Sequence, residues 1–391
     1  MDITLVINPG SSSKKYALFR DGKAVLEVLF EHTEEGYGKC IEINGERQRC
    51  EDVPASAYGA ALGETIGIAR REGLITDVRD ISRVGIRVVS PGTYFERHRS
   101  IDEDYIRLLK AMAAVAPLHI PHTVSELDAA MKIIPHARLV GVSDSAFHST
   151  MPSYARTYSI PTRDSKAYDV YRFGYHGISV ASVVRQAREE EGGFPSRAIV
   201  CHLGSGVSVT ALRDGKSIDT SMGFAPGDGL MMGTRSGDID PGALLHLMKA
   251  KNLNAAEGEA YINEEGGFKG LLGQNDLRIA LDRRARGDVS AEEAFEIFTY
   301  NIKKTIGSFA AVLGGLDLLI LTATAAERNP TIRSLVCAGL EQVGIQIDAK
   351  MNDSLMARPG LISHEESAVK VLVLHTDEMF EMALVTQDIV N

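Results

Sequence analysis

The chain of 391 residues is longer than one hydrophobic core usually serves, so two domains are expected. Its 42 Lys and Arg against 52 Asp and Glu give a net charge of −10, which disfavours a nucleic-acid partner. No apolar run reaches the roughly 18 residues of a membrane span, and the first residues lack the basic and apolar regions of a signal peptide, so we expect a cytoplasmic protein without a membrane partner.

The four cysteines are expected to be reduced. Cys40 and Cys50 flank a predicted hairpin that turns at Asn44-Gly45, but a two-residue turn of this kind places them diagonally rather than opposite each other. Cys201 lies in a core-type strand and Cys337 in a helical pattern. The absence of a C-x-x-C motif argues against thiolate metal ligation.

Residues 2–32 are predicted to form three strands with turns at Gly10-Ser11-Ser12-Ser13 and Asp21-Gly22. The serines of the first turn, followed by Lys14 and Lys15, offer hydroxyl and ammonium donors to a phosphate. An ordinary serine-rich turn is the alternative interpretation.

Two buried-type strands follow, each with one charged residue of interest. Arg87 stands inside the apolar run 84–89, where a guanidinium needs an anionic partner, either a ligand or a structural salt bridge. The strand 139–142 delivers Asp144 at its C-terminal end, and such positions face the ligand crevice in α/β sheets. Further along, His176 stands between two glycines in an aromatic patch, ahead of an amphipathic helix at 179–191.

Residues 199–220 repeat the design of the N-terminus: strand, glycine turn at Gly204-Ser205-Gly206, strand, and Asp-Gly turn. Residues 5–12 align with 199–206 without a gap, and one residue later Arg20-Asp21-Gly22-Lys23 matches Arg213-Asp214-Gly215-Lys216 identically. Two such hairpins indicate a duplicated fold with a ligand between the copies, whereas chance similarity of common turns is the alternative. The glycines, hydroxyls and arginine of residues 219–238 predict an oxyanion site, most naturally for a phosphate.

The rest of the chain alternates helices, at 242–251, 290–313 and from 376, with strands at 316–322 and 368–374. The segment 323–329 is predicted to be a loop. Strands alternating with helices, together with the duplicated hairpins, predict an α/β fold with two similar lobes.

With these residues in view, the chain resembles the acetate kinase family, of the sugar kinase, Hsp70 and actin superfamily, nearly from end to end. The family motif N-x-G-S-S-S-x-K is present at residues 8–15 and M-G-T-R-S-G-D-I-D-P at 232–241. The resemblance implies two actin-like, ribonuclease H-like lobes that arose by duplication, with the active site in the cleft between them. It also implies an acyl-substrate lobe of residues 1–146 and 377–391 and a nucleotide lobe of residues 147–376.

The activity implied by the resemblance is reversible in-line transfer of the γ-phosphoryl group of ATP to acetate, giving acetyl phosphate and ADP, in a Mg²⁺-dependent homodimer, with Mn²⁺ as an alternative ion. By that resemblance Arg87 and Arg235 hold the carboxylate and the transferring phosphoryl, and His176 stabilises its equatorial oxygens. Asp144 positions the substrate or hydrated metal. Asn8 and Glu378 help to hold the metal.

The resemblance also implies two binding sets. The acyl pocket consists of Val89, Leu118, Tyr175 and Pro226. The nucleotide site consists of Lys15, His202, Gly204, Ser205, Gly206, Asp276, Leu277, Arg278, Thr324, Ala325, Ala326, Glu327 and Arg328.

This sequence departs from the family pattern at several positions. Ser90-Pro91-Gly92 replaces H-G-G, Ser205 replaces an asparagine, and Tyr175 replaces a phenylalanine. The nucleoside motif G-I-G-E-N is replaced by residues 324–328, so the Cβ atoms of Thr324 and Ala326 are expected to project where adenosine would lie. Another nucleotide or pyrophosphate therefore stays open as donor, and a longer acyl group as acceptor. A catalytically silent nucleotide-binding protein is the alternative from another functional class.

Overall fold

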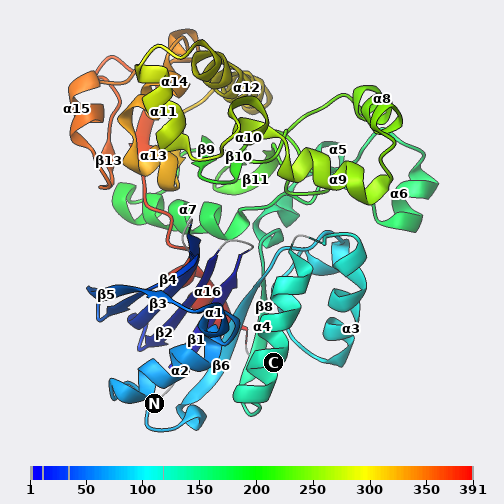
Figure 1. Ribbon diagram of the computed structural model, residues 1–391. Helices are drawn as coiled ribbons and strands as arrows, with labels where there is room; N and C mark the ends of the chain where they lie inside the picture. The colour runs from blue at the N-terminus through cyan, green and yellow to red at the C-terminus, as the bar shows by residue number, and fades with distance from the viewer. Residues whose placement is uncertain (1–2, 11–12, 34–35, 118, 390–391) are drawn as a thin grey trace. The chain divides into compact units, whose positions relative to one another are not determined.

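The computed structural model describes four stretches of the chain, residues 3–10, 13–33, 36–117 and 119–389. The chain forms two compact units, Met1–Ala146 with Asp377–Asn391, and Phe147–Thr376. Each unit has its own β-sheet with helices packed on it (Figure 1). Within the described stretches, we find no helix with the length and apolar character that crossing a bilayer requires.

The first unit contains an eight-stranded sheet in the order β5-β4-β3-β2-β1-β6-β8-β7. β1 is antiparallel to β2 and parallel to β6, and β6 is parallel to β8. The strands are β1 Ile3–Pro9, β2 Ser13–Arg20, β3 Lys23–Thr33, β4 Gly36–Ile43, β5 Glu46–Val53, β6 Ile81–Val88, β7 Arg99–Ser100 and β8 Arg138–Ser143. The helices are α1 Ala55–Gly59, α2 Ala61–Arg71, α3 Glu103–Ala111, α4 Ile120–Ile133 and α16 Glu378–Asp388.

Helices cover both faces of this sheet. Because successive residues of a strand point to opposite faces, Leu5 and Ile7 of β1 join the core that α2 and α4 complete. On the opposite face α16 packs against β1 and β6. It passes so close that a Cβ atom on Gly85 would lie 2.0 Å from Thr386 Oγ1. Glycine in β6 therefore permits the approach of the helix whose first residue is Glu378.

The second unit contains a six-stranded sheet in the order β11-β10-β9-β12-β14-β13. Its strands are β9 Arg197–Leu203, β10 Val207–Arg213, β11 Lys216–Thr220, β12 Leu318–Thr322, β13 Gly360–Leu361 and β14 Lys370–Val373. Its helices are α5 Ser153–Arg156, α6 Thr162–Tyr168, α7 Gly177–Glu191, α8 Pro241–Lys251, α9 Ala255–Glu264, α10 Gly267–Leu272, α11 Leu277–Ala285, α12 Val289–Leu313, α13 Thr324–Arg328, α14 Pro330–Cys337 and α15 Ala349–Ser354.

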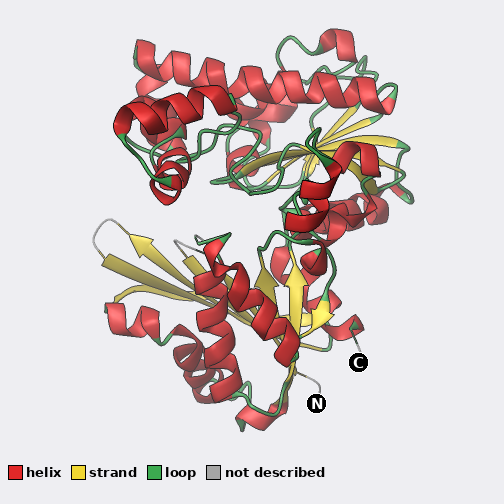
Figure 2. Cartoon of the chain, turned by 90° about the vertical axis from the view of Figure 1, so that its right-hand side faces the viewer, coloured by secondary structure: helices red, strands yellow, loops and turns green. Residues whose placement is uncertain are grey.

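The central strands of the second sheet are buried on both faces. β12 is buried at every residue, as expected for a strand covered on two sides. Valines of α7 (Val180, Val183 and Val184) pack on Ala198 and Val200 of β9. The long helix α12 also packs against β9 and β10, and it lies on the other side of the sheet from α7 (Figures 1 and 2).

The two sheets repeat one topology. The segment β3-β2-β1-β6-β8 of the first sheet and the segment β11-β10-β9-β12-β14 of the second have the same order and the same strand senses. The Asp-Gly turns match as well, since Asp21 and Asp214 have φ values of 52° and 53°, and the glycines that follow have 74° and 75°. These left-handed values suit a two-residue hairpin turn. The prediction of two similar α/β lobes is confirmed.

The prediction that all four cysteines are reduced is wrong for one pair. Cys40 and Cys50 form a disulfide between β4 and β5, with their Cα atoms 4.1 Å apart. Glu42 pairs with Arg47, whereas Ile41 pairs with Arg49, so a β-bulge inserts one extra residue in β5. This one-residue shift moves Cys50 from a diagonal position to one directly opposite Cys40. Cys201 and Cys337 are free and buried, as predicted.

Candidate active site

Four polar residues of the first unit lie together where neighbouring parallel strands end. Asn8 is near the end of β1, Arg87 is near the end of β6, and Asp144 follows the last residue of β8. The Arg87 guanidinium makes two bonds to the Asp144 carboxylate, Nη2 to Oδ2 at 2.9 Å and Nε to Oδ1 at 3.3 Å. Asp144 is buried. The geometry is the forked, bidentate pairing that arginine makes with a carboxylate.

Glu378 adds a second carboxylate from the first turn of α16. The amide Nδ2 of Asn8 donates to Glu378 Oε2 at 3.0 Å, and Arg87 Nη1 donates to Asn8 Oδ1 at 3.2 Å. Arg87 Nη1 also lies 3.6 Å from Glu378 Oε2. Burial opposes the charge of Arg87, but the two carboxylates outweigh it and raise the pKa of Arg87 above its ordinary value. The half-buried arginine thus has the anionic partners that its sequence context required.

The backbone around Asp144 is held by neighbours that the sequence did not single out. The Asp144 N–H donates to the carbonyl of Val88 at 2.9 Å. The Ser143 hydroxyl donates to the carbonyl of Phe95 and accepts from the Ser145 N–H at 3.1 Å. The Ser143 N–H donates to Nδ1 of His98 at 3.1 Å. His98 was missed because no motif marks it.

His98 is expected to make the stability of the fold pH-dependent. Burial lowers the pKa of His98 from 6.5 to about 4, although the Asp144 charge opposes the shift. Because the folded-state pKa is depressed, the neutral ring contributes fully above pH 6.5, and its contribution is lost as the pH falls toward 4. We expect this loss to be on the order of 2–3 kcal/mol.

Urea unfolding at a series of pH values tests this expectation on the native chain and on His98→Gln. The glutamine amide oxygen can still accept from the Ser143 N–H but does not titrate. The native chain should lose stability relative to the variant between pH 6.5 and 4. Parallel pH profiles for the two proteins would contradict the assignment.

Lys15 and Val89 are the other described candidates of the first unit. Lys15 pairs directly with Asn8 across the β1–β2 ladder, so the two side chains share a face. Its neighbour Lys14 points to the opposite face, where its Nζ lies 2.8 Å from Glu126 Oε1. Val89 is half-buried just beyond β6. Leu118, Ser11 and Ser12 lie outside the described residues.

Two stacked histidines form the centre of the second cluster, which belongs to the second unit. The rings of His176 and His202 lie 4.0 Å apart between centroids, at an angle of 24°. His176 Nδ1 lies 3.0 Å from the buried Ser208 hydroxyl. A Cβ atom on Gly206 would come within 2.8 Å of His176 Nε2, so only glycine allows the turn to pass this close to the ring. The Gly204 N–H closes the turn on the Gly206 carbonyl at 3.0 Å.

The loop between β11 and α8 carries Arg235 and Pro226. Arg235 Nη1 donates to the Pro226 carbonyl at 3.1 Å. The hydroxyl of the buried Tyr175 donates to the carbonyl of Phe224 in the same loop, at 2.6 Å. The partner that the Tyr175 hydroxyl needs is therefore a backbone carbonyl.

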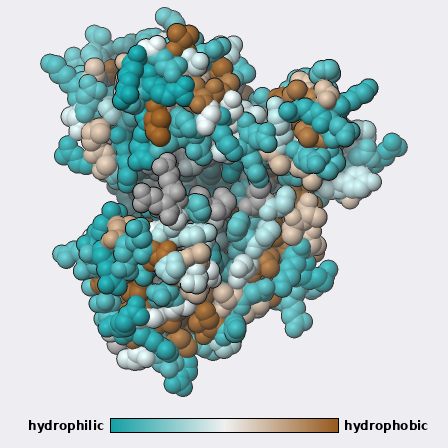
Figure 3. Space-filling model, in the orientation of Figure 1, coloured by the Kyte–Doolittle hydropathy of each residue, from teal (hydrophilic) through white to brown (hydrophobic). Residues whose placement is uncertain are grey.

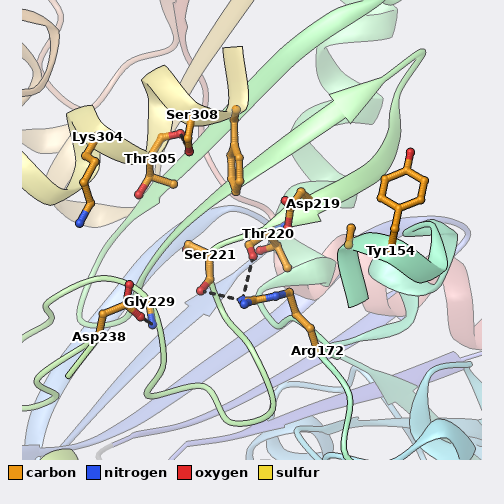
Figure 4. A pocket seen from close by; sticks show the side chains of 12 residues that line it. Tyr154, Arg172, Asp219, Thr220, Ser221, Gly229, Asp238, Lys304, Thr305 and Ser308 are labelled. Carbon is orange, nitrogen blue, oxygen red and sulfur yellow. Dashed lines mark hydrogen bonds between the residues drawn. The ribbon is translucent and has the colours of Figure 1, made fainter. Parts of the chain in front are cut away.

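A separate pocket of about 490 Å³ lies on the loop's flank, against α12 and α5 (Figure 4). Arg172 crosses it and donates from Nη1 to the carbonyls of Thr220 and Ser221, both at 3.4 Å. Asp219 and Asp238 line this pocket, but Arg235 and His176 do not. Both ends of the segment 219–238, for which the sequence predicts an oxyanion site, therefore border this pocket.

The remaining candidate nucleotide-binding residues lie at the start of α11 and in α13. Asp276 caps α11 by accepting from the Arg278 N–H at 2.8 Å, and its pKa is lowered, first by the side-chain hydrogen bond from Arg278. Leu277 is half-buried and Arg278 is exposed. The expected loop at 323–329 is instead the helix α13, which is a second correction. Glu327 Oε1 accepts from the Ala323 N–H at 2.8 Å. A side chain of the helix thus binds the backbone just before its first residue.

The structure also corrects the prediction for the Cβ of Ala326. Ala326 is fully buried within α13, so its Cβ does not project into open space where a ligand would lie. The side chains of Thr324 and Arg328 are exposed and that of Ala325 is half-buried. Ala323, just before the helix, has φ 67° and ψ 167°, a conformation that is essentially reserved for glycine and collects at functional sites.

The described residues contain no group of three or more His, Cys, Asp or Glu side chains arranged to hold a metal ion. Asp144, Glu378 and the Asn8 amide still supply hard oxygen donors in one place. That donor set fits Mg²⁺, which commonly binds one or two carboxylates and keeps several waters.

Comparison with known proteins agrees with the resemblance. A model of the acetokinase family matches residues 3–384. Acetate kinases of Clostridium acetobutylicum and Sulfurovum sp. are 38% and 36% identical over 396 and 392 residues, and both alignments cover 99% of this chain and 98% of the relative.

Solved structures agree as well. Porphyromonas gingivalis acetate kinase has a TM-score of 0.87 at 34% identity, and a propionate kinase from Francisella tularensis has 0.91 at 32%, each covering 100% of both chains. The fold is the mixed α/β fold of acetate and propionate kinases, with two sheets. The chain belongs to the acetokinase family.

Proposed function

We propose that this chain is an acetate kinase that transfers the γ-phosphoryl group of ATP to acetate, reversibly, giving acetyl phosphate and ADP. The observation that carries the proposal is the cluster of Arg87 with Asp144, Asn8 and Glu378 at the ends of β1, β6 and β8. It combines a cation for an anionic substrate with oxygen donors for a divalent metal. Family membership supplies the reaction class.

In the proposed reaction a carboxylate oxygen of acetate attacks the γ-phosphorus, and the bond from that phosphorus to the β,γ-bridging oxygen breaks. Such a transfer needs alignment and charge neutralisation more than covalent help. Arg87 binds the carboxylate and Arg235 the transferring phosphoryl. The imidazole of His176 donates to its equatorial oxygens.

Asn8 and Glu378 would hold Mg²⁺, and Asp144 would position Arg87 and the hydrated metal. The ion supplies positive charge to the phosphate oxygens when bound. Arg87 already links these three side chains by hydrogen bonds or close approach, so the carboxylates stay oriented.

The acyl pocket in this proposal uses Val89, Leu118, Tyr175 and Pro226. Because the Tyr175 hydroxyl is engaged by the Phe224 carbonyl, its ring presents an apolar surface. This suits a short acyl chain such as the acetate methyl group.

The nucleotide site in this proposal uses Lys15, His202, the turn at Gly204, Ser205 and Gly206, residues 276–278, and α13. The burial of Ala326 removes one of the two steric objections to adenosine. Pyrophosphate or another nucleotide remains the alternative donor, because Thr324 and Arg328 are exposed where the family has Gly and Asn.

A homodimer that acts in the cytoplasm completes the proposal. Apolar side chains reach the surface in small groups among hydrophilic ones (Figure 3). On α8 and α12 they are Leu245, Val289, Ile297, Tyr300 and Val312. Exposed apolar side chains of this kind suit contact with a second copy.

The proposal is tested by trapping acyl phosphate as its hydroxamate, from acetate or propionate, with ATP, GTP or pyrophosphate as donor. We expect turnover with acetate, ATP and Mg²⁺, and loss of turnover on chelation. Turnover with only pyrophosphate or only GTP would show that this compound, and not ATP, is the donor. Silence with every donor and acid, in a folded chain that binds ATP, would favour the catalytically silent binding protein.

A further inference from the structure

Hydrogen bonds connect His202 to α13 through Ser179 and Thr376, two residues that are distant in sequence. The Ser179 hydroxyl lies 2.8 Å from His202 Nδ1, and Thr376 Oγ1 donates to the Ser179 oxygen at 2.8 Å. Ser179 is fully buried in the first turn of α7. Ser179 and Thr376 are separated by 197 positions in the sequence.

The bond that Thr376 donates to Ser179 bears on which His202 nitrogen carries the proton. A serine hydroxyl has one proton to donate, and Ser179 accepts from Thr376, so its own proton is available for His202 Nδ1. A neutral imidazole that accepts at Nδ1 carries its proton on Nε2. That Nε2 lies 3.5 Å from the position that a Cβ on Gly204 would take, beside the glycine turn of the proposed phosphate site.

The same bond fixes the plane of the His202 ring. His176 stacks on that ring, with centroids 4.0 Å apart, and is held at its own Nδ1 by Ser208 at 3.0 Å. Rotation of His202 would therefore disturb the stacking of His176 as well.

These hydrogen bonds end at Glu327, in α13. Glu327 Oε1 accepts from the Thr376 N–H at 3.0 Å and from the Ala323 N–H at 2.8 Å. Its second oxygen lies 2.7 Å from His375 Nδ1. Thr376 is thus bonded through its N–H to the helix proposed to contact the nucleoside, and through its hydroxyl to Ser179.

We infer that Ser179 is a positioning residue for the nucleotide: it holds His202 with its Nε2 proton directed at the donor's phosphates, and Thr376 keeps Ser179 in that role. This inference rests on the proposed function for the role of His202 in phosphate binding. The tautomer that it assigns to His202 does not depend on catalysis.

The test compares the native chain with Ser179→Ala, Thr376→Val and Thr376→Ser. Alanine is the best helix former, so Ser179→Ala keeps α7 intact. Valine matches the shape of threonine without its hydroxyl, whereas serine retains the hydroxyl. Ser182→Ala, which removes another buried serine hydroxyl from α7, is the matched control.

Two readouts are needed. Nitrogen-15 NMR of labelled histidine, at about pH 8 where an ordinary imidazole is neutral, reports the tautomer of His202. We expect the Nε2–H form in the native chain, Thr376→Ser and Ser182→Ala, and a mixture of tautomers in Ser179→Ala. Steady-state kinetics should show a KM for ATP about three- to tenfold higher in Ser179→Ala, the range expected for loss of one hydrogen bond.

The KM for acetate should stay unchanged, and Thr376→Val should show a smaller rise in the KM for ATP than Ser179→Ala. An Nδ1–H tautomer in the native chain, or an unchanged KM for ATP in Ser179→Ala, would overturn the inference. If the native chain lacked kinase activity, the proposed function would fail, and the NMR signal would still decide whether Ser179 sets the His202 tautomer.

Discussion

Replacing Arg235 by alanine is expected to lower kcat for acetyl phosphate formation about a thousandfold, in a chain that stays folded. Arginines that stabilise a transferring phosphoryl group contribute roughly 10³ to 10⁵ in rate, since they neutralise charge that develops only in the transition state. The hydroxamate assay measures kcat, and circular dichroism with thermal unfolding checks the fold.

The fold should survive because Arg235 is half-buried in a loop, outside the helices and strands of the second unit. Its guanidinium donates to the carbonyl of the half-buried Pro226 at 3.1 Å and lies 3.6 Å from the Met232 sulfur. In the alanine variant, water can take the place of the guanidinium at the Pro226 carbonyl.

Two further variants make the Arg235 result specific. Arg235→Lys keeps the charge but loses the planar fork, so its kcat should fall between those of the native chain and the alanine variant. Arg163→Ala removes an arginine whose side chain is 87% exposed, and it should leave kcat unchanged. A kcat for Arg235→Ala within about threefold of the native value would remove Arg235 from the proposed phosphoryl site.

The cluster of the first unit could be anticipated from the sequence because it depends on a simple rule. Residues at the carboxyl ends of neighbouring parallel strands meet at one edge of a sheet. Asp144 followed one recognisable apolar run and Arg87 stood inside another, and β6 and β8 are indeed parallel neighbours. The duplication was visible as well, since matching Asp-Gly turns join β2 to β3 and β10 to β11.

What could not be predicted depends on contacts between distant segments or on single-residue irregularities. A β-bulge that places two residues of one strand opposite one of its neighbour leaves no mark in the hydropathy pattern, so the Cys40–Cys50 disulfide was missed. His98 accepts from the Ser143 N–H, and Thr376 donates to the Ser179 hydroxyl. Only the tertiary fold brings these partners together. Ala326 is buried within the short helix α13. A helix of five residues is too short to show a clear hydrophobic periodicity in the sequence.

Loss of Arg333 should destabilise the protein strongly. It is fully buried on α14. Its five N–H groups make five hydrogen bonds, to the Asn352 side-chain and main-chain oxygens at 2.7 and 2.6 Å, and to the carbonyls of Ala326, Glu327 and Leu355 at 2.6, 3.3 and 2.7 Å. Burial lowers the pKa of Arg333, yet arginine stays charged in proteins.

These oxygens explain how a buried cation is tolerated without a carboxylate hydrogen-bonded to it. Ala326 and Glu327 belong to the last turn of α13, and Asn352 belongs to the last turn of α15. Carbonyls at a helix C-terminus lack partners within the helix and carry partial negative charge. Arg333 therefore joins two helix ends and a loop that would otherwise leave buried acceptors unpaired.

Arg333→Met should lower the free energy of unfolding of the second unit by on the order of 3–5 kcal/mol. Methionine fills a similar length of the site but leaves several buried carbonyls without a donor, and each unpaired group costs about 1–3 kcal/mol before relaxation. Urea unfolding, followed by a probe in the second unit, measures the change. Because α13 loses its anchor, the KM for ATP should also rise.

Arg333→Lys separates charge from geometry. Lysine restores the positive charge but has three donors on one nitrogen, so it cannot reach acceptors that lie on both sides of a planar fork. Its stability should therefore stay closer to that of Arg333→Met than to that of the native chain. If lysine restored native stability, charge alone would account for the role of Arg333. A loss below about 1 kcal/mol in Arg333→Met would show that α13 and α15 pack independently of the arginine.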